Sequence, residues 1–163
     1  MIKKNLSNKI VIGTAQLDHN YGIIKNRKKI TRNKLVNIFD YLKEKNYLFI
    51  DTSSNYKNAE NSLQNINLKE FKIISKIEKL RDKKNIFEYL NKKVLKSIKK
   101  LNINSFEGYL LHDEKDLLSS KSDEIFEVLT LLKKKGYIKK IGISMYNFDK
   151  AIEVIKNYKI DII

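Results

Sequence analysis

The sequence of 163 residues contains no cysteine, no proline and no tryptophan, and only five glycines. The absence of cysteine excludes disulfide bonds and thiolate metal sites. No apolar segment approaches the roughly 20 residues of a transmembrane helix, and the N-terminal segment lacks the apolar core of a signal peptide. These absences predict a cytoplasmic protein with no membrane partner. A composition of 42% hydrophobic and 33% charged residues is typical of one globular domain.

Positive charge is in large excess, and the formal net charge is +15. Such an excess is common among nucleic-acid-binding proteins. Here, however, the basic residues are scattered as pairs with one triplet at Lys133–Lys135, and no patch interleaved with aromatic residues accompanies them. We therefore expect a lysine-rich solvated surface and no nucleic-acid partner. The positive field would favour anionic ligands such as the phosphates of a dinucleotide.

Short apolar runs alternate with longer amphipathic stretches along the chain. The runs are rich in β-branched residues and predict strands buried on both faces: Ile10–Ile12, Tyr47–Ile50, Phe71–Ile74, Gly108–Leu111, Ile141–Ile143 and Ile160–Ile163. The stretches between them have the 3.6-residue period of helices, with Thr31, Asn85 and Asn147 as predicted N-caps. A further helix is predicted from Ser122 to the lysines that precede Gly136. This alternation predicts a parallel α/β fold.

The last predicted helix, which follows Asn147, has an apolar side of its own. The residues of this side are Ile152, Ile155 and Tyr158. Apolar residues at this spacing form one side of an amphipathic helix.

Polar residues follow five of the predicted strands, at the point where each apolar run ends. They are Gly13-Thr14, Asp51, Ser75-Lys76, His112 and Ser144. In a parallel sheet these residues emerge at the same edge, where ligands bind in open sheets and active sites lie in closed barrels. One charged residue at a strand end usually just begins a loop. An acid, a lysine and a histidine from three successive strands predict a functional site.

The chemistry of this set narrows its role. Tyr56 lies five residues after Asp51, so a short loop can return its phenol to the same edge. A phenol has a pKa of about 10 and is a poor acid at neutral pH unless a cation stabilises the phenolate. Lys76 can supply that cation, and Asp51 can hold the lysine by a charge-assisted hydrogen bond. With His112 directed at a substrate oxygen, the set suits carbonyl reduction by hydride from a nicotinamide cofactor.

The order and spacing of seven segments resemble those of the aldo/keto reductase family. These segments are Gly13–Ala15, Asp51–Tyr56, Ala59-Glu60, Ile74–Lys76, Ser97–Leu101, Tyr109–His112 and Leu132–Ser144. The resemblance implies an oxidoreductase that reduces an aldehyde or a ketone with NADPH or NADH and without a metal. It also implies that Tyr56 is the general acid, that Lys76 and Asp51 lower its pKa, and that His112 orients the substrate.

The resemblance further implies a cofactor-binding set at the nicotinamide end. Its members are Gly13, Thr14, Asp51 and Ser144. Met145 stands where the family commonly has an asparagine that holds the carboxamide, so we do not expect that contact here. Residues 13–16 together with residues 21–23 resemble a branch of the family that acts on sugar-derived substrates. His19, in the same loop, is expected to be a surface residue.

The family has the fold of an eight-stranded TIM barrel, (β/α)8, which typically needs about 250 residues. The sequence supplies about five and a half β/α units, so we expect an incomplete barrel over residues 1–163, truncated at its C-terminus. The open sheet edges of such a piece could support self-association. Two functions compete: the carbonyl reductase, and a catalytically inactive barrel fragment that acts as a binding or assembly module. The first is favoured because the whole catalytic set is present.

Overall fold

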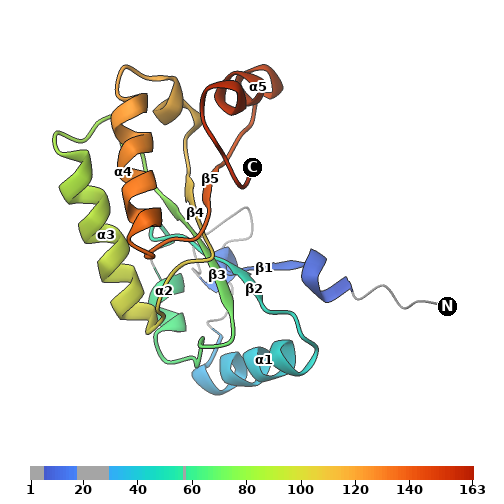
Figure 1. The fold of residues 1–163 in the computed structure, drawn as a ribbon. Helices are drawn as coiled ribbons and strands as arrows, with labels where there is room; N and C mark the ends of the chain where they lie inside the picture. Colours follow the sequence, from blue (N-terminus) through green and yellow to red (C-terminus); the bar gives the residue numbers. More distant parts are fainter. Residues whose placement is uncertain (1–5, 18–29, 57) are drawn as a thin grey trace.

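The structure is a computed structural model that describes residues 6–17, 30–56 and 58–163. Five strands form one parallel sheet (Figure 1): β1 (Val11–Gly13), β2 (Phe49–Asp51), β3 (Lys72–Ile77), β4 (Gly108–Leu111) and β5 (Ile141–Ile143). The α-helices are α1 (Arg32–Glu44), α2 (Ala59–Leu63), α3 (Ile86–Leu101), α4 (Ser122–Lys134) and α5 (Phe148–Asn157). The 3-10 helices are η1 (Leu6–Lys9), η2 (Ala15–Leu17) and η3 (Glu114–Leu118). The predictions for His19 and for residues 21–23 fall outside the described residues.

The order of the strands in the sheet is the order of the strands along the chain. Each strand pairs in parallel with the next one, from β1 to β5. A doubly wound sheet reverses its strand order and carries helices on both faces. Here the order does not reverse, and helices α1 to α4 lie on one side of the sheet (Figure 1). The predicted parallel α/β fold is therefore confirmed, with the winding of consecutive barrel units.

The hydrophobic core lies between the sheet and these helices. In β3, Ile73, Ser75 and Ile77 are buried, whereas Lys76 lies on the opposite and more open face. The apolar run Phe71–Ile74 predicts that the strand ends at Ser75 and Lys76. In the structure, β3 continues through Lys76 to Ile77, which pairs with Leu111 of β4. The strand extends further than predicted because its polar residues alternate between the two faces and do not interrupt the pairing.

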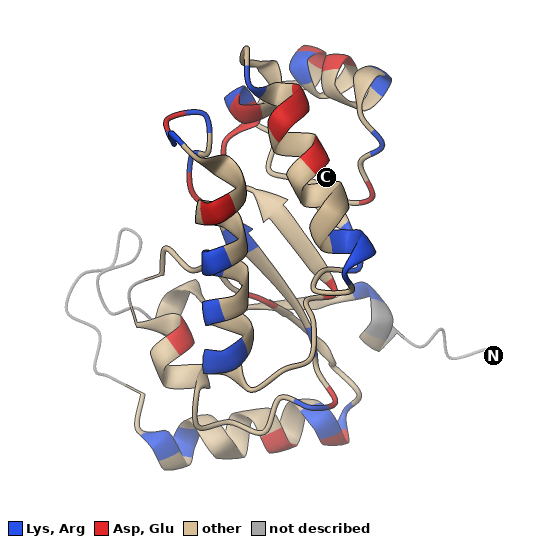
Figure 2. Cartoon of the chain, turned by 60° about the vertical axis from the view of Figure 1, so that its left-hand side comes forward, with Lys and Arg blue, Asp and Glu red and all other residues tan. Residues whose placement is uncertain are grey.

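Capping residues fix where three of the helices begin. The side chains of Thr31, Asn85 and Asn147 each accept a hydrogen bond from the backbone N–H three residues later. These are the N-caps that the sequence predicted. Within the described ranges, no helix is long and apolar enough to cross a membrane. Lysines recur along α3 and gather at the C-terminal end of α4 (Figure 2), where they complement the helix dipole.

The cap at Asn85 gives a direct test of how α3 is held. Its Oδ1 accepts a hydrogen bond of 2.9 Å from the backbone N–H of Glu88. We expect Asn85→Ala to lower the free energy of unfolding by about 1 kcal/mol, because that N–H loses its partner. Urea unfolding followed by circular dichroism measures the change. Asn85→Asp retains a capping oxygen and should stay close to the wild type, and an equal loss in both variants would contradict the assignment.

The predicted sixth strand, Ile160–Ile163, is represented in the structure by a single β-bridge. Ile162 forms an isolated parallel bridge with Gly142, and no strand is formed there in the part of the chain that the structure describes. Ile162 packs closely over two glycines of the sheet. A Cβ at Gly108 would lie 2.6 Å from Cδ1 of Ile162, and one at Gly142 would lie 3.0 Å from its Cβ. A side chain at Gly142 would have to displace both Leu110 and Ile162, so glycine there leaves room for Ile162 where a sixth strand would continue the barrel.

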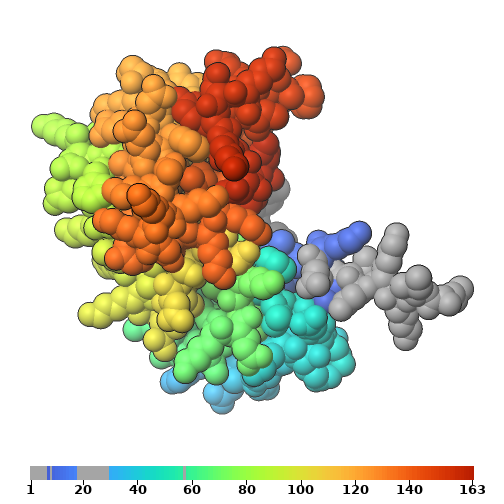
Figure 3. Space-filling model, viewed as in Figure 1, coloured from blue at the N-terminus to red at the C-terminus, as the bar shows by residue number. Residues whose placement is uncertain are grey.

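The apolar side predicted for the last helix is only partly covered in the structure. Val154 is the buried residue of α5, whereas Ile155 is 44% exposed. The reason is position: α5 lies beside the end of the sheet, where it contacts η3 (Figures 1 and 3). Two large aromatic side chains at the start of this helix are also open to solvent: Tyr146, just before it, at 83%, and Phe148, its first residue, at 78%. Self-association through the open edges of the sheet stays a prediction.

Candidate active site

The residues predicted for the site lie at the carboxyl-terminal edge of the sheet. Gly13 and Asp51 are the last residues of β1 and β2 and pair with each other. Backbone hydrogen bonds extend the pairing past the strand ends. The N–H of His112 donates to Ile77 O (3.0 Å), and that of Ser144 donates to Leu111 O (2.8 Å). The sequence-based expectation that these residues share one edge is therefore met by the strand register.

Asp51 and Lys76 form an ion pair at the centre of this edge. The Lys76 ammonium donates to Oδ1 of Asp51, and the two side chains are 13% and 29% exposed. Lys76 Nζ also lies 6.0 Å from the centroid of the Tyr56 ring, on which it sits as a cation–π partner. Three side chains from β2, β3 and the intervening loop therefore meet within one cluster.

The loop after β2 returns Tyr56 to the sheet through its serines. The hydroxyls of Ser53 and Ser54 lie 3.4 and 3.3 Å from Lys76 O and donate to it. The N–H of Tyr56 in turn donates to Ser53 O over 3.1 Å. These contacts bend the chain back over β3, because short hydroxyl side chains satisfy backbone groups that a loop leaves open. Tyr56 is 8% exposed and is held against Lys76.

Glu60 positions the next element and was missed as a structural residue. Its carboxylate is buried, accepts a hydrogen bond of 2.9 Å from the Ser97 hydroxyl and lies 3.7 Å from Lys100 Nζ. These contacts join α2, which follows the Tyr56 loop, to α3. The sequence does contain one indication of this contact: Ser97 is a polar residue within the apolar stripe of α3 that includes Val94 and Leu101. A buried hydroxyl at such a position needs a partner from another element.

The four predicted cofactor-binding residues differ in accessibility. Gly13 is exposed, and a Cβ built on it would meet no atom within 4 Å. Thr14 is buried, and its hydroxyl donates to Asp51 O over 3.0 Å. Ser144 is half-buried at the end of β5, and Met145 after it packs against the core. Apart from the paired Asp51, the predicted cofactor-binding residues that are accessible to solvent are therefore Gly13 at β1 and Ser144 after β5, on either side of the Asp51–Lys76 pair.

A cavity of about 630 Å³ opens beside this edge, with His112 and Asn55 in its wall. Its other lining residues come from the loops after β3, β4 and β5. Asn55 directly precedes Tyr56, so the cavity borders the cluster described above. Its volume lies within the range of small-molecule sites, roughly 300–1,000 Å³.

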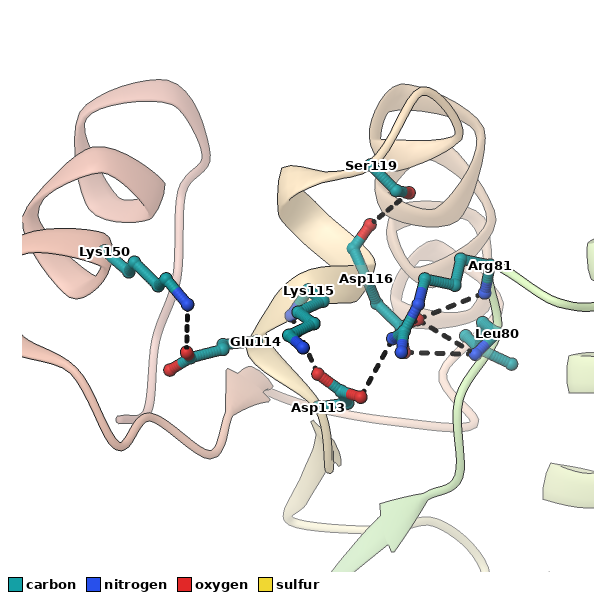
Figure 4. Close-up of polar contacts among 8 residues, drawn as sticks. All are labelled: Leu80, Arg81, Asp113, Glu114, Lys115, Asp116, Ser119 and Lys150. Carbon is teal, nitrogen blue, oxygen red and sulfur yellow. Dashed lines mark hydrogen bonds and ion pairs between the residues drawn. The ribbon is translucent and has the colours of Figure 1, made fainter.

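A buried network holds the loops that form the cavity wall (Figure 4). Asp116 of η3 is fully buried and accepts hydrogen bonds of 3.1 Å from the backbone N–H groups of Leu80 and Arg81. The Arg81 guanidinium bridges Asp116 (3.2 Å) and Asp113 (2.9 Å). Burial alone would raise the pKa of Asp113, but hydrogen bonds from Lys115 N–H and Arg81 outweigh it and lower the pKa. Asp113 therefore stays ionised and paired.

Comparison with known proteins identifies the family of the chain. The model of the aldo/keto reductase family matches residues 9–163. No curated protein sequence matches the chain.

Solved structures share the fold at low sequence identity. A Pseudomonas aeruginosa protein assigned to the aldo-keto reductases is 18% identical with a TM-score of 0.73, over 90% of this chain and 59% of that chain. The holo form of aldo-keto reductase AKR11C1 from Bacillus halodurans is 20% identical with a TM-score of 0.67, over 93% and 50%. An aldo/keto reductase from Klebsiella pneumoniae in complex with NADP and acetate is 17% identical with a TM-score of 0.68, over 91% and 49%.

The chain thus spans between 49% and 59% of the length of these three proteins. Five parallel strands alternate with helices in an open sheet, as expected for an incomplete (β/α)8 TIM barrel. The family match extends over nearly the whole chain and includes every residue of the cluster at the sheet edge. The chain belongs to the aldo/keto reductase family.

Proposed function

We propose that this chain carries the catalytic residues of an NAD(P)H-dependent reductase of aldehydes or ketones. The observation that supports the proposal is the cluster of Asp51, Lys76 and Tyr56, in which one ammonium contacts both the carboxylate and the phenol ring. Membership of the aldo/keto reductase family gives the same reaction class.

In the proposed reaction, the Tyr56 hydroxyl gives its proton to the carbonyl oxygen of the substrate. The Lys76 ammonium stabilises the phenolate that this step leaves, and Asp51 holds the ammonium in place. His112, in the wall of the adjoining cavity, donates a hydrogen bond to the same substrate oxygen and orients it. A positioned general acid of this kind contributes about 10²- to 10⁴-fold to a rate.

The residues at this edge fit the nicotinamide end of a bound dinucleotide. Gly13 leaves open space at the end of β1, and the Ser144 hydroxyl can both donate to and accept from a carboxamide. The Thr14 hydroxyl already donates to Asp51 O, so it keeps only its acceptor capacity. When bound, the nicotinamide supplies the hydride. The NADP in the Klebsiella pneumoniae structure supports this choice of cofactor.

Replacement of Lys76 tests the proposal. We expect Lys76→Met to lower kcat/KM for NADPH-dependent aldehyde reduction by about a hundredfold, because the phenolate of Tyr56 loses its counter-charge. The measurement is the initial rate of NADPH oxidation at saturating cofactor with a panel of aldehydes. Lys72→Met is the matched control, since Lys72 lies on the same strand and makes no ion pair within the described part of the chain.

The control variant should retain the wild-type rate within about twofold, as expected for an exposed surface substitution. Equal losses in the two variants would indicate a general effect of charge or stability and would contradict the assignment. A wild-type protein that oxidises no NADPH with any aldehyde would reject the proposed function itself.

A further inference from the structure

The cavity beside His112 is lined by charged side chains of both signs. Most of its carboxylates form ion pairs, whereas its lysines form none among the described residues. Four carboxylates line it, and three of these hold a cation that does not itself line the cavity: Asp113 with Arg81, Glu114 with Lys150, and Glu78 with Lys93. The hydrogen bond from Lys150 lowers the pKa of Glu114, so this group stays ionised and neutralised by its partner. The fourth carboxylate belongs to Asp82.

The lysines of the same wall form no direct ion pair within the described ranges, although the charges of Lys79 and Lys83 help to lower the pKa of Asp113 and of Glu78. Lys79 and Lys115 form no ion pair with any residue that the structure describes. The ammonium of Lys83 lies over the Tyr89 ring, 4.5 Å from its centroid, and likewise pairs with no described carboxylate. Among the residues that line the cavity, three lysines and Asp82 therefore form no ion pair within the described part of the chain. A wall with this excess of positive charge attracts anions.

The two loops that carry Lys79 and Lys115 are fixed relative to each other (Figure 4). Asp116 binds the backbone of Leu80 and Arg81, immediately after Lys79, and belongs to the same 3-10 helix as Lys115. Asp113 accepts a 3.0 Å hydrogen bond from the N–H of Lys115. Because these hydrogen bonds hold the backbone on both sides, Lys79 and Lys115 line one cavity without a further ordering of the loops.

We propose that the substrate of this enzyme is an anionic carbonyl compound, whose carboxylate or phosphate binds Lys79 and Lys115 while its carbonyl lies at His112. The inference rests on the proposed function for the reacting end of the substrate. The cavity connects the two ends, since His112 and both lysines line it. Charge-assisted hydrogen bonds from two ammonium groups distinguish an acidic substrate from a neutral one of equal size.

Equilibrium dialysis with paired probes tests the site without requiring turnover. The first pair is 4-carboxybenzaldehyde and 4-(hydroxymethyl)benzaldehyde, and the second is glyceraldehyde 3-phosphate and glyceraldehyde. We expect the wild-type chain to bind the anion of at least one pair about tenfold more tightly than its neutral analogue, the size of one charge-assisted hydrogen bond. Which pair shows the preference distinguishes a carboxylate from a phosphate.

The double variant Lys79→Gln/Lys115→Gln should lose this preference and leave the neutral probes unchanged. Lys92→Gln/Lys96→Gln removes the same charge from the exposed side of α3 and should keep the preference. Equal affinity for both members of each pair in the wild type would overturn the proposal. An equal loss in both double variants would also overturn it, because the preference would then come from net charge alone.

The same probes separate this inference from the proposed function. A preference for anions that is lost in Lys79→Gln/Lys115→Gln, without any NADPH-dependent reduction, supports the anion site and rejects the reductase. Reduction of charged and neutral aldehydes with equal kcat/KM supports the reductase and rejects the anion site. Urea unfolding of each variant checks that the fold is retained.

Discussion

Tyr56→Phe should lower kcat/KM for NADPH-dependent carbonyl reduction by about a thousandfold, the size of effect expected for loss of a positioned general acid. The substitution removes one oxygen and keeps the ring on which Lys76 Nζ sits at 6.0 Å. The Asp51–Lys76 pair and the serine contacts of the loop do not involve the phenol oxygen, so the geometry of the edge should persist. Steady-state kinetics with saturating NADPH measures the loss.

A second tyrosine provides the matched control. Tyr41 is 57% exposed on α1, and Tyr41→Phe removes the same hydroxyl without touching the sheet edge. It should retain wild-type turnover. Binding of NADPH, followed by its fluorescence, should be equal in the wild type and both variants. Undiminished reduction by Tyr56→Phe would show that another group supplies the proton.

Asp116→Ala should give the largest loss of stability, about 3–5 kcal/mol in the free energy of unfolding. The carboxylate is fully buried and accepts from two backbone N–H groups and from the Arg81 guanidinium. Its removal leaves the Leu80 N–H buried without an acceptor and leaves Arg81 with Asp113 alone. Unsatisfied buried donors and a half-paired cation are both costly.

Urea unfolding of the wild type and two variants measures this effect. Asp40→Ala is the control, since Asp40 is exposed on α1 and its loss should change the free energy of unfolding by less than about 0.5 kcal/mol. A similar small change in Asp116→Ala would contradict the view that this network holds the loops after β3 and β4 together.

Local patterns predicted the frame of the fold well, because each strand and long helix carries its own signal. The apolar run at Gly108–Leu111 and the cap at Asn147 depend only on neighbouring residues, and both were confirmed. The five-residue helix α2 (Ala59–Leu63) was not predicted, because it is too short to show a helical period. Its position depends on Glu60 and its contact with α3, which no local pattern contains.

The same distinction applies to the site. Asp51, Lys76 and His112 could be placed together from the sequence, since parallel strands bring their ends to one edge. The role of Asp116 could not be predicted, because its partners lie 35 and 36 residues earlier in a loop without a motif. The exposure of Ile155 on the apolar side of α5 is a related case. Helical periodicity identifies an apolar side but does not show whether another element covers it.

The unreversed strand order also bears on how the site is formed during folding. Asp51 and Lys76 are separated by 25 residues, and Leu80 and Asp116 by 36, so each contact joins neighbouring units of the chain. Contacts of short sequence separation require little loop-closure entropy and form early. During synthesis, the Asp51–Lys76 pair could therefore assemble once β3 has emerged, before the units that line the cavity have been made. In this topology the Asp51–Lys76 pair precedes the cavity beside His112 in time as well as in sequence.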